Sequence, residues 1–298
     1  MRLEGRTAII TGAGGGLGRQ HALYLAGKGA RVVVNDAVAA QAEAVADEVR
    51  ASDGEAIAVA ASVADEAAVA AMVARTLEAW GRIDILVNNA GILRDRSFAN
   101  MRLDEFREVL DVHVMGAATC CKAVWAQMRA QGRGRIVLTT SSSGLYGNFG
   151  QANYGAAKMA LVGLMQTLAI EGGKYDIRVN CLAPTAATGM TAGVLPEESL
   201  RVLDPALVSP ALLPLVADDA PNRAIVCAGG GHFARAWVTL TAGRYLGGGE
   251  DVGERLIRAW DAVSDPDGQV MPDYGFTQAE REVASAQAHA LAPRAETA

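Results

Sequence analysis

Short apolar runs alternate with longer amphipathic stretches over the first two thirds of the chain. The runs are rich in β-branched residues and are too short for buried helices, so they predict strands. The predicted strands are Thr7–Thr11, Arg31–Asn35, Ala56–Ala60, Ile83–Val87, Arg135–Thr140 and Ile177–Leu182. The predicted helices between them are Leu17–Gly27, Ala39–Ala51, Glu66–Trp80, Leu103–Arg129 (long, or broken at Gly116) and Tyr154–Glu171. Strands that are apolar on both faces and alternate with helices predict a Rossmann-type doubly wound α/β fold with a covered parallel sheet.

The pattern loosens after Pro184. The segment Met190–Pro214 carries four prolines and many leucines, and it predicts short helices and loops. Ala224–Cys227 predicts a last strand and Asp251–Val263 a helix, whereas the chain turns polar from Asp265. We therefore expect a Rossmann domain over residues 1–264, a loop-rich substrate-covering segment at about 185–215, and a weakly ordered polar tail over residues 265–298.

The composition argues against several classes of protein. With 51% hydrophobic and 20% charged residues, the chain of 298 residues is typical of a globular protein. A net charge of −6 argues against binding to nucleic acid, which requires basic stripes. Cys120, Cys121, Cys181 and Cys227 lack metal-ligand spacing, so we expect reduced thiols, no metal site and a cytoplasmic protein. The early charged residues and the lack of a long uncharged apolar stretch predict neither a signal peptide nor a membrane span.

A glycine cluster follows the first predicted strand and opens the first predicted helix. Residues Thr11–Gly18 read TGAGGGLG, with the spacing GxxxGxG. Glycine permits positive φ and lets backbone N–H groups approach a pyrophosphate at the positive end of a helix. Its position between a strand and a helix favours a nucleotide-phosphate loop over a simple turn.

Asp36 lies at the end of the second predicted strand, directly after Asn35, and is the candidate residue for determining the preference between NAD and NADP. A carboxylate at this place accepts hydrogen bonds from a ribose 2′-OH and repels a 2′-phosphate. Gly15 and Ala37, where a cation would meet that phosphate, are neutral. The pattern therefore favours NAD over NADP, and the alternative is that Asp36 belongs to an ordinary turn.

Tyr154 and Lys158 are spaced i, i+4 and so lie on one face of a predicted helix. An ammonium beside a phenol favours the phenolate, so we expect Lys158 to lower the pKa of Tyr154 and make it an acid/base for alcohol–ketone interconversion. Ser141 follows the strand Arg135–Thr140, at the sheet edge where such sites form, and its hydroxyl is placed to hold a carbonyl oxygen. Ser142 and Ser143 compete for this role, and simple loop capping is the alternative for each serine.

These motifs together resemble the short-chain dehydrogenase/reductase family, over roughly residues 3–235. The resemblance rests on TGAGGGLG, on NNAG at Asn88–Gly91, on Ser141 and on YGAAK at Tyr154–Lys158, in this order. A narrower similarity is to the (3R)-hydroxyacyl-CoA dehydrogenase part of peroxisomal multifunctional enzyme type 2 and its bacterial relatives. It is carried by Asn35–Asp36, residues 91–98, Val112–His113, residues 145–154, residues 183–191 and residues 195–197.

The resemblance implies a role for each matching residue. Tyr154 is the acid/base, Lys158 binds the nicotinamide ribose and tunes Tyr154, and Ser141 orients the substrate oxygen. The implied cofactor contacts are Gly12, Gly16 and Leu17 at the pyrophosphate, Asp36 at the adenosine ribose, Asn89 and Gly91 at the flank, and Pro184 and Thr188 at the nicotinamide end.

Two positions depart from the family pattern. His113 stands where the family has a helix asparagine, and Gly116 completes the NxxG spacing. His113 either takes part in the site or is a core or capping histidine. Ser62 and Val63 replace the aspartate that contacts adenine, so their cofactor contact is less defined.

The implied function is that of an NAD-dependent oxidoreductase acting on a secondary alcohol. The substrate that we expect first is a 3-hydroxyacyl-CoA or a steroid-related acyl-CoA. Arg94, Arg96 and Arg102 are candidates for CoA phosphates, although solvated surface arginines are the more common case. A dehydrogenase of free steroids, ketones or polyols is the alternative enzyme, and a non-catalytic dinucleotide sensor is the alternative of another class. The family implies a homodimer or homotetramer through the helices Leu103–Arg129 and Tyr154–Glu171.

Overall fold

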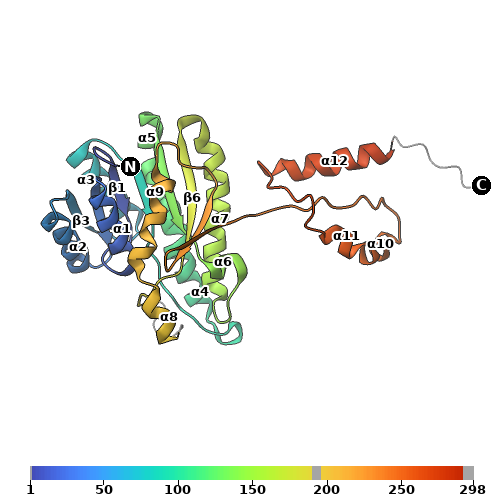
Figure 1. Cartoon of the computed structure of the whole chain (residues 1–298), viewed down its shortest axis with the longest axis horizontal. Helices are drawn as coiled ribbons and strands as arrows, with labels where there is room; N and C mark the ends of the chain where they lie inside the picture. The colour runs from blue at the N-terminus through green and yellow to red at the C-terminus, as the bar shows by residue number, and fades with distance from the viewer. Residues whose placement is uncertain (1, 190–195, 291–298) are drawn as a thin grey trace, which may run out of the picture. The chain divides into compact units, whose positions relative to one another are not determined.

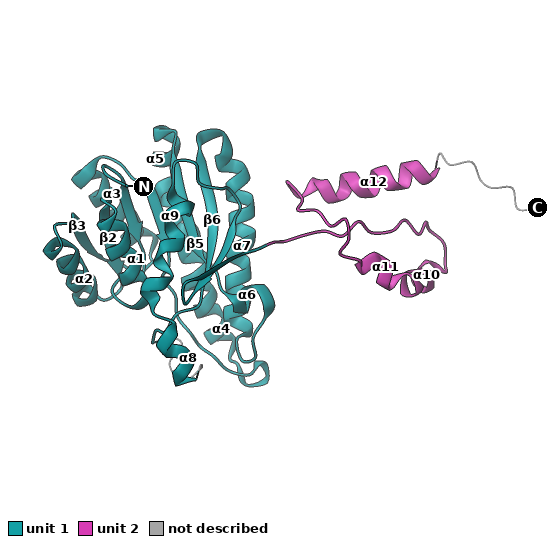
Figure 2. Ribbon diagram, viewed as in Figure 1, with its two compact units in different colours: residues 1–236 teal, residues 237–298 magenta. Residues whose placement is uncertain are grey.

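The computed structural model of the chain describes residues 2–189 and 196–290 (Figure 1). Its residues form two compact units, 1–236 and 237–298 (Figure 2). The first unit contains a sheet of eight strands in the order β3-β2-β1-β4-β5-β6-β7-β8. The strands are β1 (Thr7–Ile10), β2 (Arg31–Asp36), β3 (Ala56–Ala60), β4 (Ile85–Asn88), β5 (Gly134–Thr139), β6 (Ile177–Pro184), β7 (Ile225–Gly229) and β8 (His232–Ala236).

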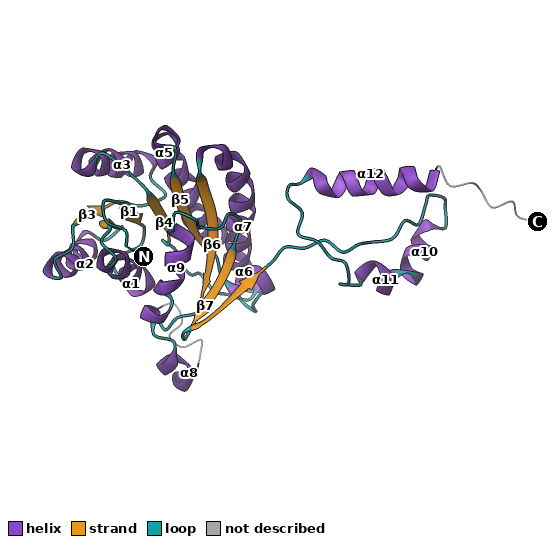
Figure 3. Ribbon diagram, turned by 45° about the horizontal axis from the view of Figure 1, so that its top comes forward, coloured by secondary structure: helices purple, strands orange, loops and turns teal. Residues whose placement is uncertain are grey.

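The sheet is parallel from β1 to β7, and β8 pairs antiparallel to β7. Successive side chains of a strand point to opposite faces. In β2, Val32 and Val34 therefore belong to the core on one face and Val33 to the core on the other. Helices lie on both sides of the strands (Figure 3), which confirms the predicted Rossmann-type α/β fold with its doubly covered sheet.

Each face of the sheet buries its own set of helices. One core joins the sheet to α1 (Gly16–Gly27), α2 (Ala39–Ala51), η5 (Ser209–Ala211) and α9 (Leu212–Val216). The other core joins it to α3 (Glu66–Trp80), α5 (Gly116–Gln131) and α7 (Ala152–Gly172). The remaining helices of this unit are η1 (Phe98–Asn100), α4 (Leu103–Leu110), η2 (Asp111–Met115), α6 (Ser142–Tyr146), η3 (Gly173–Tyr175), α8 (Glu197–Val202) and η4 (Pro205–Leu207).

The stretch predicted as one helix over Leu103–Arg129 consists of three helical parts. Between α4 and α5 lies η2, a π-helical turn of five residues, and Gly116 is the first residue of α5. By length and composition alone, Leu103–Gln131 could cross a membrane, a property that it shares with core helices of globular proteins. Val124 and Met128 of α5 are buried in the core, so its apolar side has a place in the fold.

The expectation that residues 224–227 form the last strand was wrong, because β8 follows β7 directly. The two residues between these strands, Gly230 and Gly231, have φ of +57° and +78°. Two successive residues with positive φ form the tight turn that matches the twist of a β-hairpin. The Gly229–Gly231 run was therefore the sequence signal for a hairpin.

The second unit begins at residue 237, earlier than the boundary expected after residue 264. Its helices are α10 (Val252–Arg258), α11 (Trp260–Ser264) and α12 (Phe276–Ala290), so the expected single helix 251–263 is two helices and the expected tail contains a third. None of its described residues, 237–290, is buried, and Trp260 and Phe276 are more than half exposed. The helix α12 was missed because the chain turns polar from Asp265 and this composition was interpreted as a tail.

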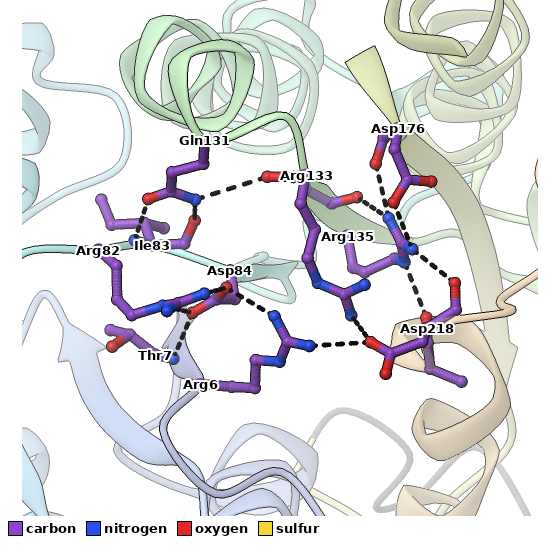
Figure 4. A network of polar contacts seen from close by, with 12 residues as sticks. Arg6, Thr7, Arg82, Ile83, Asp84, Gln131, Arg133, Arg135, Asp176 and Asp218 are labelled. Atoms are coloured by element: carbon purple, nitrogen blue, oxygen red, sulfur yellow. Dashed lines mark hydrogen bonds and ion pairs between the residues drawn. The ribbon is translucent and has the colours of Figure 1, made fainter. Parts of the chain in front are cut away.

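A network of arginines and aspartates, in which Asp84 and Arg135 are fully buried, lies at the amino-terminal edge of the sheet (Figure 4). Asp84 accepts hydrogen bonds from the Thr7 amide at 2.9 Å and from both sides of the Arg82 guanidinium. Burial opposes its ionisation, but these bonds and the charges of Arg82 and Arg6 hold its pKa below the ordinary value. Because most of these charged groups are paired with one another, we expect this edge to contribute to stability.

Arg135 is the centre of the second half of this network. Its side chain is fully buried and donates five hydrogen bonds, to the carbonyls of Gly134, Asp176, Ala217 and Asp218 and to the Asp176 carboxylate. Removing a buried charge that satisfies several acceptors leaves those acceptors without partners.

Arg135→Met should therefore lower the free energy of unfolding by about 3 kcal/mol or more. Arg50→Met is the matched control, because Arg50 pairs with Glu43 and Asp47 on an exposed helix surface and should cost less than about 1 kcal/mol. Urea unfolding of both variants measures the difference. Equal losses would mean that the buried network is no more important than a surface ion pair.

Candidate active site

A cleft of about 390 Å³ opens at the carboxyl ends of the parallel strands. This is the edge at which ligands bind in open α/β sheets. The cleft is lined by Gly12, Gly15, Gly16, Leu17, Gly18, Asp36, Gln41, Asn89, Ala90, Gly91, His113, Thr139, Tyr154, Lys158, Pro184, Ala186, Thr188 and Gly189. Residues predicted from separate motifs are thus brought together in one site.

The glycine loop depends on close packing that side chains would prevent. Gly12 has φ of +60°, and a Cβ there would lie 2.7 Å from the Ala90 Cα. A Cβ on Gly18 would lie 2.2 Å from the carbonyl oxygen of Gly12. The first turn of α1 carries no acidic residue, and its N-cap Gly15 makes no side-chain hydrogen bond. The first N–H groups of α1 are therefore suited to an anion such as a pyrophosphate.

Asn89 holds this loop from the end of β4. Its side-chain amide donates to the carbonyls of Thr11 at 3.0 Å and Gly12 at 3.1 Å. In return, the Thr11 hydroxyl accepts hydrogen bonds from the amides of Asn89 and Ala90. The role of Thr11 was not predicted, because its partner lies far away in the sequence.

Asp36 lies in the cleft and is held by two backbone amides. Its carboxylate accepts hydrogen bonds from Gly14 at 3.0 Å and from Val38 at 3.0 Å. A Cβ on Gly14 would lie 2.8 Å from the Asp36 Cγ and 2.7 Å from the Cβ of Gln41, so only glycine permits this approach. Among the described residues that line the cleft, the one lysine or arginine is Lys158, which contacts the end of β5 rather than β2.

Tyr154 and Lys158 project from one face of α7, with the Lys158 Nζ 5.4 Å from the centre of the phenol ring. The buried Nζ donates a hydrogen bond of 2.6 Å to the carbonyl of Thr139 at the end of β5. Ser141 precedes α6 and hydrogen-bonds to Tyr154, while its hydroxyl also accepts from the Ser143 amide at 3.2 Å. The three predicted catalytic residues therefore form one cluster.

The expected lowering of the Tyr154 pKa was wrong. Burial raises this pKa, the hydrogen bond with Ser141 lowers it, and the charge of Asp95 raises it further. Burial also lowers the pKa of Lys158 from 10.5 to about 7. Loss of hydration disfavours the charged form of both groups, and this effect outweighs their mutual attraction.

His113 lies in η2 and is buried beside the cluster. Its Nε2 lies 3.0 Å from the nitrogen and 2.9 Å from the oxygen of Ile92, and its ring meets the Tyr154 ring edge-on at 5.3 Å. Burial and the charge of Lys158 lower its pKa to about 3, so the ring is neutral at working pH. A Cβ on Gly91 would lie 2.2 Å from the His113 Cε1. His113 thus supports the backbone at Gly91 and Ile92.

Other predicted residues have different outcomes. Pro184 and Thr188 line the cleft, and a Cβ on Gly16 would lie 3.6 Å from the Thr188 Cγ2, so Thr188 lies beside the glycine loop. Ser62 and Val63 are not among the described residues that line it, and Val63 packs at Gly116 instead. Residues 190–195 of the substrate-covering segment lie outside the described residues.

The three arginines considered for CoA phosphates already have acidic partners. Arg94 pairs with Glu108, Arg96 with Glu105 and Arg102 with Asp104. The structure thus favours the alternative in which these arginines are surface groups.

Comparison with known proteins gives this arrangement a family. The model of the short chain dehydrogenase family matches residues 6–199. The chain belongs to the short-chain dehydrogenase family. A short-chain type dehydrogenase/reductase of Mycobacterium tuberculosis, Rv0148, is 46% identical over 78% of this chain and 85% of its own length. Members of this family are oxidoreductases that bind nicotinamide dinucleotides.

Two further members of the family are similar to this chain in sequence or in structure. Peroxisomal multifunctional enzyme type 2 of Drosophila melanogaster is 45% identical over 70% of this chain, but the match covers 36% of that longer enzyme. Its full-length structure superimposes with a TM-score of 0.82 and 34% identity, over 97% of this chain and 50% of that one. A 7α-hydroxysteroid dehydrogenase in complex with NADH and 7-oxo glycochenodeoxycholic acid has a TM-score of 0.72, with 32% identity over 77% of this chain and 95% of its own.

The lowered pKa of Lys158 predicts how the stability of the protein without added cofactor depends on pH. Between pH 7 and 10.5 the unfolded chain holds a proton on this lysine that the folded chain does not. Stability should therefore increase as pH rises through this interval, and the whole cost of charging the buried lysine is present below pH 7.

Lys158→Met should raise the thermal midpoint most below pH 7, with a difference that shrinks toward pH 10.5. Lys122→Met is the control, because Lys122 is exposed on α5. Thermal unfolding followed by circular dichroism at several pH values makes the measurement. A constant difference between Lys158→Met and the unmodified protein would contradict the assignment.

Proposed function

We propose that the protein is an NAD-dependent oxidoreductase that interconverts a secondary alcohol and a ketone. The observation that carries this proposal is that Tyr154, which hydrogen-bonds to Ser141, and Lys158 line the same cleft as the glycine loop and Asp36. The glycine loop and the open N-terminus of α1 fit a dinucleotide, which supplies a hydride acceptor or donor when bound.

The residues of this cluster divide the chemistry among them. Ser141 orients the substrate oxygen by a hydrogen bond, and Tyr154 takes the hydroxyl proton in oxidation or returns it in reduction. The Lys158 Nζ lies 5.4 Å from the centre of the Tyr154 ring, and its protonated form, which predominates below its pKa of about 7, stabilises the phenolate by its charge. His113 supports the wall of the site and takes no proton at working pH, because its pKa is near 3.

The preference for NAD rests on Asp36. Its carboxylate is anchored by two amides and lies in the cleft, where it can accept hydrogen bonds from a ribose hydroxyl. A 2′-phosphate would meet this negative charge, and Lys158, the cationic side chain among the described lining residues, lies at the end of β5, separated from Asp36 on β2 by β1 and β4.

Asp36→Ala should reduce the preference for NAD over NADP by about tenfold or more, because it removes both an attraction and a repulsion, each worth about 1 kcal/mol or more. The ratio of kcat/KM for the two cofactors measures the effect. Asp47→Ala on the outside of α2 is the control and should leave the ratio unchanged. Equal use of both cofactors by the unmodified protein would contradict the proposed preference.

For the substrate, we propose a 3-hydroxyacyl-CoA or a steroid-related acyl-CoA. The similarity to multifunctional enzyme type 2 supports it. Exposed apolar side chains on the segments after Ser141 and Pro184, such as Tyr146, Phe149 and Val202, also suit an apolar acyl group or ring system. The ion-paired arginines give this proposal no support. Free steroids are the leading alternative, because the 7α-hydroxysteroid dehydrogenase superimposes well.

A panel of acyl-CoA, free steroid and small secondary alcohol substrates should give NADH with an acyl-CoA, as measured by absorbance. Tyr154→Phe keeps the ring but removes the transferable proton, so turnover should fall by about 100-fold or more while folding survives. Good turnover of steroids or small alcohols without any acyl-CoA would select the alternative enzyme. No turnover of any substrate despite NAD binding would favour a dinucleotide sensor.

The protein is further proposed to be a cytoplasmic homodimer or homotetramer that binds neither nucleic acid nor membrane. The apolar face would come from α4, η2, α5 and α7, where Met115, Met159 and Ile170 are exposed and a groove of about 380 Å³ is lined by residues that include Trp125 and Tyr175. Sedimentation as a monomer at micromolar concentration would contradict the oligomer.

A further inference from the structure

A chain of hydrogen bonds connects Asp95 to Ser141, the serine that hydrogen-bonds to Tyr154, and Gln151 is at the centre of this chain. The Gln151 side-chain amide donates to the carboxylate of Asp95 at 2.6 Å. Its carbonyl oxygen accepts from the hydroxyl of Ser143 at 2.7 Å, and the Ser143 amide donates to the Ser141 hydroxyl. Asp95 is therefore connected through nearly buried Gln151 to the serine that hydrogen-bonds to Tyr154.

The segment that carries Asp95 is also fixed to the start of α7. The Arg96 amide donates to the Gly150 carbonyl at 2.9 Å. The Asn153 side chain, which is fully buried, donates to the Arg94 carbonyl at 3.0 Å. Because Gln151 is the N-cap residue of α7 and Tyr154 lies in its first turn, these bonds hold Asp95 at a set place relative to the phenol.

We propose that Asp95 is a positioning residue whose negative charge, held by Gln151, keeps the proton on Tyr154 and sets the pH range of the reaction. The proposal rests on the proposed function, in which Tyr154 is the acid/base. Asp95 acts on Tyr154 by its charge, and Gln151 keeps that charge in place.

The groups that face Tyr154 come from four elements. Lys158 comes from α7 itself, His113 from η2, Ser141 from the start of α6 and Asp95 from the segment after β4. Lys158 has a pKa near 7, and His113 is neutral. The charge of Asp95 raises the pKa of Tyr154 beyond the effect of burial. A nearby like charge disfavours the phenolate, because two negative charges repel each other.

Asp95→Asn tests the charge while it preserves size and an oxygen that can accept the Gln151 bond. The acid limb of kcat/KM for alcohol oxidation should move to lower pH by about 0.5 unit or more, because the phenol loses its proton more easily. The alkaline limb of ketone reduction should move in the same direction. Asp47→Asn on α2 is the matched control and should move neither limb.

Tyrosinate absorbance gives a second readout without cofactor or substrate. Subtracting the titration of Tyr154→Phe isolates the phenol of Tyr154, and its midpoint should fall in Asp95→Asn by the same amount as the acid limb. Asp95 is exposed, so high salt should screen its charge, and the unmodified protein should approach the variant as the Debye length falls from about 30 Å to about 3 Å. This salt series tests the proposal even if Asp95→Asn fails to fold.

The outcomes separate the proposal from the proposed function. If Tyr154→Phe abolishes turnover but Asp95→Asn moves neither the pH limbs nor the tyrosinate midpoint, Asp95 has only a structural role. An unmodified protein whose limbs do not respond to salt would also overturn the proposal. If Tyr154→Phe retains full turnover, the proposed acid/base itself is wrong.

Discussion

Parallel pairing of β1, β4, β5 and β6 is the constraint on which the site depends. Ile10 pairs with Val87, Asn88 with Leu138, and Thr139 with Leu182. This register brings the residues that follow each strand to one edge of the sheet. Thr11 thereby meets Asn89, and Thr139 meets the Nζ of Lys158. No single motif could make these contacts, because each joins the end of a strand to another part of the chain.

The two edges of the sheet solve the problem of buried polar groups in opposite ways. At the amino-terminal edge, Arg135 and Asp84 are fully buried and are surrounded by partners. At the carboxyl-terminal edge, the buried Lys158 donates a hydrogen bond to the carbonyl of Thr139, and its pKa falls to about 7. Groups that are poorly solvated and poorly paired have protonation states that respond to their surroundings, and this property is typical of catalytic sites. The division assigns stability to one edge and chemistry to the other.

The Tyr154 pKa reflects a balance among burial, Ser141 and Asp95. The spacing of tyrosine and lysine four residues apart predicts that the two groups are close enough to attract each other, but it does not predict how deeply they are buried. Burial reverses the expected direction for the phenol and lowers the pKa of the lysine as well. The charges beyond the YxxxK motif therefore matter as much as the motif.

The sequence by itself determined the alternation of strands and helices, the glycine loop, the second-strand aspartate and the serine, tyrosine and lysine of the cluster. These features depend on local periodicity and on residue types at short spacings, both of which can be read from the sequence without knowledge of the fold. Tertiary structure alone decided the π-turn at His113, the clamp between Thr11 and Asn89, the pairing of the arginines with glutamates and aspartate, and the approach of Asp95 to Gln151. The hairpin to β8 had a local signal in Gly230 and Gly231, and helical structure at 251–263 was predicted as well, whereas α12 was not, because the chain is polar there. Contacts between distant segments depend on the register of the sheet and on the exclusion of water, and the local pattern of residues predicts neither of them.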